Sequence, residues 1–200
     1  MKRFKLRIPA TAGKVETVID DPESDRRGVV LVAHPHPLHG GSLDNKVVNT
    51  LAKTAVDHGW VAVRPNFRGV GMSEGTFDAG VGETEDLLAV VRFVEKSYPD
   101  LPWTLAGFSF GAYVQHRLRQ QLNARRLILI APAVTLYAFD PVPADTVVIF
   151  GDADEVIPPA AMRDWADSQQ LTVKVIPGAG HFFHGKLKEL KQAFVEACPC

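Results

Sequence analysis

The sequence contains P-W-T-L-A-G-F-S-F-G-A-Y-V-Q-H-R-L at residues 102–118, and this stretch decides the fold. Residues 103–106 form an apolar run typical of a buried strand, and the pattern after Gly111 is that of a helix. Ser109 therefore stands at a strand-to-helix turn with a glycine two positions away on each side. So sharp a turn strains its central residue and leaves no room for side chains at Gly107 and Gly111. The pattern predicts a nucleophile elbow that presents the Ser109 hydroxyl above a sheet edge and leaves the Phe110 amide free to face an oxyanion.

Length and composition indicate one globular domain. The chain has 200 residues, 46% of them apolar and 22% charged, so a single domain over residues 1–200 can bury a sizeable core. A net charge of −1 does not supply the basic surface that nucleic-acid binding needs. The first residues alternate basic and apolar side chains, unlike a signal peptide, and every apolar run is too short to cross a membrane. We expect a cytoplasmic monomer or weak dimer that neither binds nucleic acid nor inserts into a membrane.

Strand-like and helix-like segments alternate along most of the chain. Two short strand patterns, at residues 4–8 and 15–19, predict an opening hairpin. Further strands are predicted at residues 28–33, 60–64, 103–106, 127–131, 147–150 and 171–176. Helices are predicted at residues 45–58, 82–98, from 112 onward, 158–169 and 186–197. This order predicts an α/β fold with a mostly parallel central sheet and helices on both faces.

A serine hydroxyl needs a histidine to take its proton and a carboxylate to orient that histidine. Asp154 follows the predicted strand that ends at residue 150, and His181 follows the one that ends at residue 176. The carboxyl ends of parallel strands meet at one edge of the sheet, where the sites of α/β proteins form. Ser109, Asp154 and His181 are therefore the predicted nucleophile, acid and base, and Asp152 and His184 are nearby competitors for the last two roles.

Four further segments carry a family resemblance. They are HPHPLHGGSLDNKVV at residues 34–48, NFRGVGMSEG at 66–75, GDADEVIP at 151–158 and GAGHFF at 178–183. With the elbow and the Ser, Asp, His order, they resemble the α/β-hydrolase superfamily over nearly the whole chain, and within it small lidless bacterial serine hydrolases. The resemblance implies a three-layer α/β-hydrolase fold without a lid domain and serine-hydrolase chemistry. It also favours Asp154 over Asp152, which directly follows Gly151 and suits a turn.

The resemblance implies a second oxyanion donor in the loop after the first parallel strand. The matching segment is residues 36–38, with proline at the central position. Because Pro37 has no N–H, we expect the Leu38 amide to act together with Phe110. Histidines 34, 36 and 39 are expected to shape this loop rather than to bind a metal ion, since alternate residues of an extended segment point opposite ways.

The resulting hypothesis is a hydrolase of small carboxylic esters that works through an acyl-enzyme and needs no cofactor or metal. A small peptidase or amidase with the same residues, and a non-catalytic binding protein of the same fold, remain alternatives. The glycine-rich residues 68–75 predict a tight turn near the mouth of the site, and residues 132–145 are too few for a lid and could line one wall of a shallow cleft. Cys198 and Cys200 are expected in a solvated, reactive tail.

Overall fold

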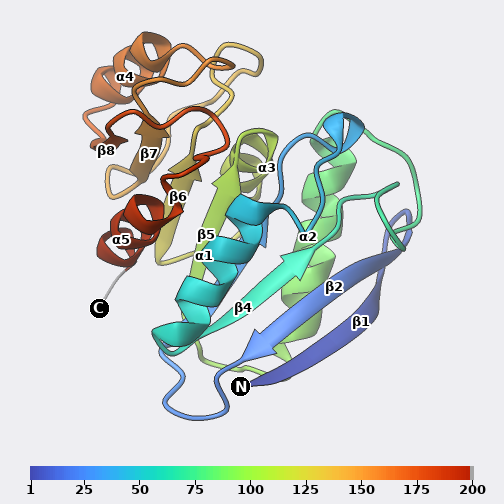
Figure 1. The fold of residues 1–200 in the computed structure, drawn as a ribbon. Helices are drawn as coiled ribbons and strands as arrows, with labels where there is room; N and C mark the ends of the chain where they lie inside the picture. The colour runs from blue at the N-terminus through green and yellow to red at the C-terminus, as the bar shows by residue number, and fades with distance from the viewer. Residues whose placement is uncertain (199–200) are drawn as a thin grey trace.

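The computed structural model describes residues 1–198, and within them eight strands form one sheet (Figure 1). The strands are β1 (Lys2–Ala10), β2 (Gly13–Asp21), β3 (Gly28–Ala33), β4 (Trp60–Pro65), β5 (Trp103–Phe108), β6 (Arg126–Ile130), β7 (Val147–Gly151) and β8 (Thr172–Ile176). The helices are η1 (Pro37–His39), α1 (Lys46–Asp57), α2 (Val81–Glu95), α3 (Phe110–Arg119), α4 (Pro159–Ser168) and α5 (Leu187–Ala197). The predicted elements are present, with ends that differ by a few residues.

The sheet is antiparallel only at its N-terminal edge. Its strand order is β1-β2-β4-β3-β5-β6-β7-β8, in which β1 pairs with β2 and β2 with β4 in antiparallel register. The remaining neighbours are parallel. The predicted opening hairpin and the mostly parallel α/β sheet are therefore confirmed, and β5 lies near the centre of the sheet.

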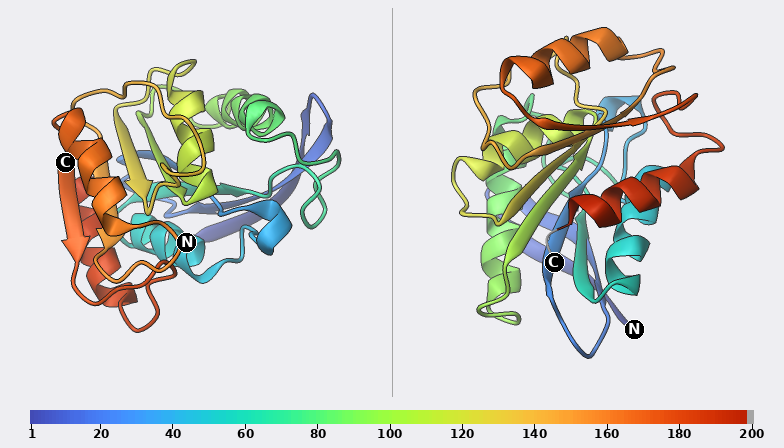
Figure 2. Two further views of the ribbon diagram at one scale, coloured as in Figure 1. Left: turned by 90° about the horizontal axis from the view of Figure 1, so that it is seen from above. Right: turned by 90° about the vertical axis from the view of Figure 1, so that its left-hand side faces the viewer.

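Helices cover both faces of the sheet, which makes three layers. Seen from above, α1 and α5 lie on one side and α2 and α3 on the other (Figure 2), and the members of each pair contact each other. Helix α4 packs against β7 and β8. Residues 131–146, which join β6 to β7, contain neither helix nor strand, so no lid is inserted between these strands.

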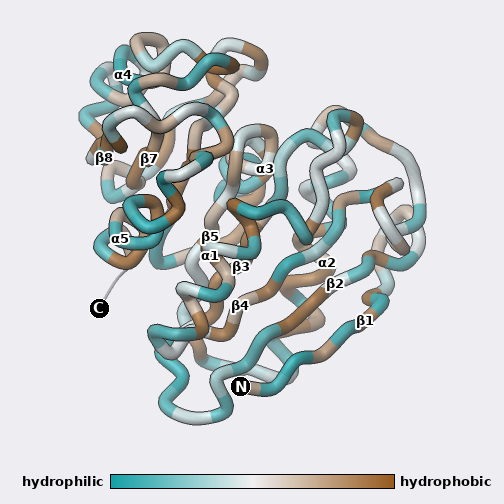
Figure 3. The backbone as a smooth tube through the Cα atoms, in the orientation of Figure 1, coloured by the Kyte–Doolittle hydropathy of each residue, from teal (hydrophilic) through white to brown (hydrophobic). Residues whose placement is uncertain are grey.

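The strand β3 shows why the core has two halves. All six of its residues are buried, and alternate residues of a strand face opposite sides of the sheet. Val29 and Leu31 belong to the cluster under α2 and α3, while Val30 and Val32 belong to the cluster under α1 and α5. Many of the hydrophobic segments, coloured brown in Figure 3, belong to the central strands. Because helices cover both faces of the sheet, a functional site is expected at the carboxyl ends of its parallel strands.

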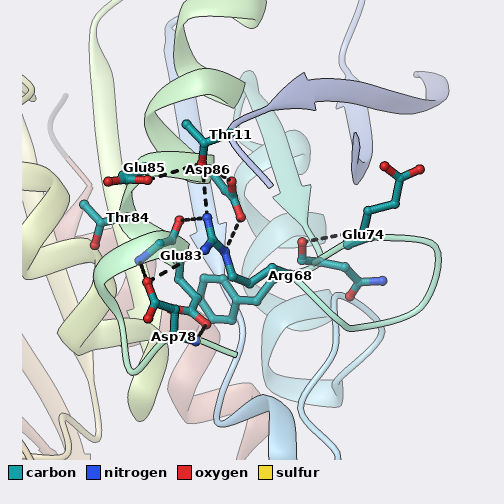
Figure 4. A network of polar contacts seen from close by, with 12 residues as sticks. Thr11, Arg68, Glu74, Asp78, Glu83, Thr84, Glu85 and Asp86 are labelled. Atoms are coloured by element: carbon teal, nitrogen blue, oxygen red, sulfur yellow. Dashed lines mark hydrogen bonds and ion pairs between the residues drawn. The ribbon is translucent and has the colours of Figure 1, made fainter. Parts of the chain in front are cut away.

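The glycine-rich loop after β4 is held by Arg68 (Figure 4). Arg68 donates from Nε to Asp86 Oδ2 at 2.8 Å and from Nη2 to the Gly82 carbonyl at 2.7 Å and to Thr11 Oγ1 at 3.2 Å. The loop thereby joins the hairpin to the start of α2, and residues 68–75 do not contribute to the lining of the cavity that contains Ser109. The predicted turn is present, but its residues do not form part of the cavity wall.

The end of α5 corrects one expectation. Cys198 is half-buried against the cluster under α1 and α5, and burial raises the pKa of its thiol to about 12. A solvated, reactive Cys198 was therefore the wrong prediction, while Cys200 lies outside the described residues. Among residues 1–198, no helix combines the length and the apolar character that a membrane span requires.

Candidate active site

Ser109 occupies the tight turn between β5 and α3. Its backbone has φ 56° and ψ −115°, a region that side-chain-bearing residues rarely adopt. The Ser109 amide donates to the Ile130 carbonyl at 2.8 Å, which ties the turn to β6. A Cβ at Gly107 would overlap the backbone of Gly111, and one at Gly111 would overlap the backbone of Ala33. Both glycines are therefore needed for the close approach, as the sequence pattern predicts.

The structure brings Ser109, His181 and Asp154 into one hydrogen-bonded chain. His181 Nε2 lies 3.0 Å from Ser109 Oγ, and His181 Nδ1 lies 2.8 Å from Asp154 Oδ2. The side chains of His181 and Asp154 are 3% and 0% exposed. Because the carboxylate can only accept, the imidazole proton belongs on Nδ1, and Nε2 is left to accept the serine proton.

The two aspartates after β7 have different partners. Asp154 Oδ1 accepts the amides of Val156 and Ile157, both at 2.8 Å, so the carboxylate is fixed on the side away from His181 as well. Asp152 is exposed, and its Oδ1 accepts the Gly178 amide at 2.6 Å. Asp152 thus closes a turn and does not contact the imidazole.

The two histidines after β8 also separate clearly. His181 is buried, and its amide donates to Glu155 Oε2 at 3.1 Å, which links the histidine loop to the loop after β7. His184 is exposed, and its ring lies against Phe182 with centroids 6.0 Å apart. Only His181 reaches Ser109.

His34 connects the end of β3 to the loop after β4. It is fully buried, and its Nε2 accepts the Phe67 amide at 2.9 Å, so Nδ1 donates to the Pro35 carbonyl at 2.7 Å. Burial lowers the pKa of His34 to about 4, which keeps the ring neutral. Both ring nitrogens are engaged with backbone groups, which agrees with the expectation that this histidine shapes the loop.

The expected second oxyanion donor, the Leu38 amide, is not placed with Ser109. Leu38 N–H donates to Nδ1 of His36, the residue that caps η1, at 3.2 Å, and Leu38 is 68% exposed. The side chain of His36 folds back over the turn and satisfies this amide locally. His36 lines the cavity together with Ser109. Burial lowers the pKa of the His36 imidazole, and the neighbouring His39 lowers it further.

The cavity that contains Ser109 has a volume of about 310 Å³. Its lining comes from four loops and the elbow: Pro35, His36, His39, Gly40, Gly41 and Asn45 follow β3; Ala133, Leu136 and Tyr137 follow β6; Val156 follows β7; His181 and Phe182 follow β8; and Ser109 and Phe110 lie at the elbow. A larger groove of about 580 Å³ between β8 and α5 is lined by neither serine nor histidine. The cavity at the elbow is therefore the candidate active site.

Sequence reasoning missed the place of His36 on this wall. The sequence signal was Pro37, which has no N–H, so the amides of both its neighbours, His36 and Leu38, were candidates, and only the structure excludes Leu38. Residues 132–145 were expected to line one wall of a cleft. Within this segment Tyr137 lines the cavity, whereas Phe139 does not. Phe139 packs instead against Trp165 and His116.

Comparisons with known proteins agree with this architecture. A family model described as serine aminopeptidase, S33, matches residues 24–142. An uncharacterized protein of Rickettsia prowazekii is 35% identical over 198 residues, covering 90% of this chain and 82% of the relative. A solved structure from Xanthomonas campestris, described as a serine hydrolase without a lid, is 40% identical with a TM-score of 0.93, covering 98% of this chain and 93% of that one. A serine hydrolase homologue of Coxiella burnetii is 39% identical with a TM-score of 0.90, covering 99% and 97%.

Proposed function

The chain belongs to the α/β-hydrolase superfamily and is a serine hydrolase, and on that premise we propose that it cleaves small carboxylic esters through an acyl-enzyme on Ser109. The observation that carries the proposal is the hydrogen-bonded chain from Asp154 through His181 to Ser109, which ends on the wall of an open cavity. A pure binding protein would have no use for a strained serine at the end of such a chain, since the strain costs about 1–3 kcal/mol.

In the proposed reaction, Ser109 Oγ attacks the ester carbonyl while its proton passes to His181 Nε2. Asp154 accepts from Nδ1 and stabilises the imidazolium that forms. His181 then returns the proton to the leaving alkoxide as the C–O bond breaks. A water molecule, deprotonated by the same nitrogen, hydrolyses the acyl-enzyme and frees Ser109.

The tetrahedral oxyanion needs N–H donors, and we assign two backbone amides to it. Phe110 is the first residue of α3, so its N–H has no acceptor within the helix. The second donor that we assign is the His36 amide. We do not assign the Leu38 amide, because it already donates to His36 Nδ1. His36 lines the cavity, Pro35 has no N–H, and the described residues provide no hydrogen-bond acceptor for the His36 amide.

The lining of the cavity favours esters over the substrates of an aminopeptidase. An aminopeptidase has to hold the free ammonium of its substrate, which calls for an accessible carboxylate. Within residues 1–198, the residues that line the cavity include no aspartate or glutamate, and the Asp154 side chain is fully covered. A neutral ester makes no such demand.

One ester and two anilides test this proposal. We expect p-nitrophenyl butyrate to be hydrolysed with a higher kcat/KM than the corresponding butyryl p-nitroanilide and leucine p-nitroanilide. Ser109→Ala should lower ester turnover by at least about 10³-fold while leaving the circular dichroism spectrum unchanged. Faster cleavage of the leucine anilide would contradict the substrate class. Ester turnover that survives Ser109→Ala would contradict the mechanism.

A further inference from the structure

Aromatic and imidazole rings make up much of the lining of the candidate active site. Of its side chains, five carry an aromatic ring besides the reactive His181: His36, His39, Phe110, Tyr137 and Phe182. These rings come from the loop after β3, the elbow, the segment between β6 and β7, and the loop after β8. Rings therefore come from the elbow and from three of the four loops around Ser109, while the loop after β7 contributes Val156, and the described lining contains no lysine or arginine.

Neighbouring rings hold one side of this lining in place. Phe110 is 1% exposed, and its centroid lies 5.0 Å from that of His36 and 5.4 Å from that of Tyr137. Tyr137 in turn stacks on Tyr113 at 4.6 Å with an interplanar angle of 19°. Because these rings are already packed, a ligand that contacts them does not have to order them first.

Phe182 offers a ring face beside the proposed general base. It is 40% exposed although it lies next to the buried His181, and the two rings meet edge to face at 88° with centroids 5.2 Å apart. Leu136 and Val156, both on the lining, are 65% and 48% exposed, so the apolar surface continues to the cavity mouth. A substrate group at the mouth therefore meets a ring and aliphatic side chains rather than water alone.

We propose that this site selects esters that carry a flat aromatic ring, an inference that rests on the proposed ester hydrolysis. Aromatic pairs at centroid separations of about 4.5–7 Å gain attraction beyond the area that they bury, whereas a saturated ring of similar size gains only from burial. The volume of about 310 Å³ lies at the lower end of ligand cavities, which favours one ring and a small second group.

Paired esters that differ only in ring saturation test the inference. The first pair is benzyl acetate and cyclohexylmethyl acetate, and the second is ethyl phenylacetate and ethyl cyclohexylacetate. Each ratio of kcat/KM is divided by the corresponding ratio of alkaline hydrolysis rates, which removes intrinsic reactivity. We expect the aromatic member of at least one pair to be favoured about 3- to 10-fold. The cyclohexyl group is the more hydrophobic, so apolar burial alone predicts the opposite order.

Variants identify the rings responsible. Phe182→Leu and Tyr137→Leu keep apolar side chains but remove the rings, and at least one of them should bring the corrected ratio close to one, whatever its effect on the absolute rate. Phe93→Leu is the matched control because Phe93 is an exposed aromatic residue on α2 outside the lining, and its ratio should match that of the unaltered protein. Corrected ratios at or below one for both pairs, or ratios unaffected by both ring removals, would overturn the inference.

Binding to Ser109→Ala separates this inference from the proposed function. Saturation-transfer NMR should show benzyl alcohol binding at least about 3-fold more tightly than cyclohexylmethanol, with the preference lost when Phe182→Leu or Tyr137→Leu is added. If no ester is hydrolysed but this preference is found, the proposed function fails and the aromatic selectivity stands. If esters are hydrolysed without a preference in either measurement, the selectivity fails and the proposed function stands.

Discussion

Replacing Asp154 with asparagine should disable His181 while leaving the site intact. The Val156 and Ile157 amides hold Oδ1, so the single oxygen of the Asp154→Asn side chain is kept at that position. Its NH₂ group then faces His181 Nδ1, 2.8 Å from the present carboxylate oxygen. Two donors cannot share this contact, so the imidazole proton moves to Nε2. In that tautomer Nε2 no longer accepts the proton of Ser109.

The expected cost is a loss of about 10⁴ in kcat, equivalent to about 5 kcal/mol of transition-state stabilisation. KM should change little, because the Asp154 side chain is 0% exposed and cannot touch the substrate. The assay is steady-state hydrolysis of p-nitrophenyl butyrate at pH 8, with thermal unfolding of each variant to show that the fold is retained.

Asp152→Asn is the matched control. It makes the same chemical change two positions away, on an exposed side chain that accepts only the Gly178 amide, and the asparagine oxygen can still accept that bond. We expect activity within about 3-fold of the unaltered protein. Equal losses for the two variants, or a larger loss for Asp152→Asn, would refute the assignment of Asp154 as the residue that orients the histidine.

Three other predictions follow from the loop after β3 and from the cavity. His36→Pro fits the observed φ of −53° and removes the N–H that His36→Ala retains, so kcat should be about 10²- to 10³-fold lower in the proline variant; equal rates would argue against this donor. The pKa of His34 is about 4 in the folded state and near 6.5 in the unfolded chain. As the pH falls from 6.5 to 4, only the unfolded chain binds this proton, so the free energy of unfolding should decrease by about 3 kcal/mol. Urea titrations should show that His34→Gln lacks this part of the pH dependence, and an identical slope in both proteins would contradict it. In a p-nitrophenyl ester series, kcat/KM should stop rising beyond about four acyl carbons, since the cavity of about 310 Å³ leaves further methylenes in water; a steady rise past eight carbons would refute this.

The elbow and the sheet were predictable because short-range rules determine them. Glycines at positions 107 and 111 are required by close backbone contacts, and the continuous apolar run of residues 28–33 is required by burial on both faces. The convergence of Ser109, Asp154 and His181 follows from the same logic, since parallel strands bring their carboxyl ends to one edge.

The errors arose where long-range contacts or a local turn decide the outcome. Leu38 was assigned as a donor because the pattern does not show that the His36 ring folds back onto its amide. The sequence also did not show what holds the loop around Arg68, because its contacts are with Thr11 and Asp86, 57 and 18 residues away in sequence. Cys198 follows an amphipathic helix, and only the packing of α5 shows that this residue is half-buried.

The most direct test of the central claim is covalent labelling of the nucleophile. A fluorophosphonate probe reacts with a serine that is activated by a base beside an oxyanion hole. Intact mass followed by peptide mapping should find one adduct, on Ser109, formed rapidly in the unaltered protein and absent from Ser109→Ala. An adduct on another residue, or no adduct on protein that hydrolyses esters, would contradict the account.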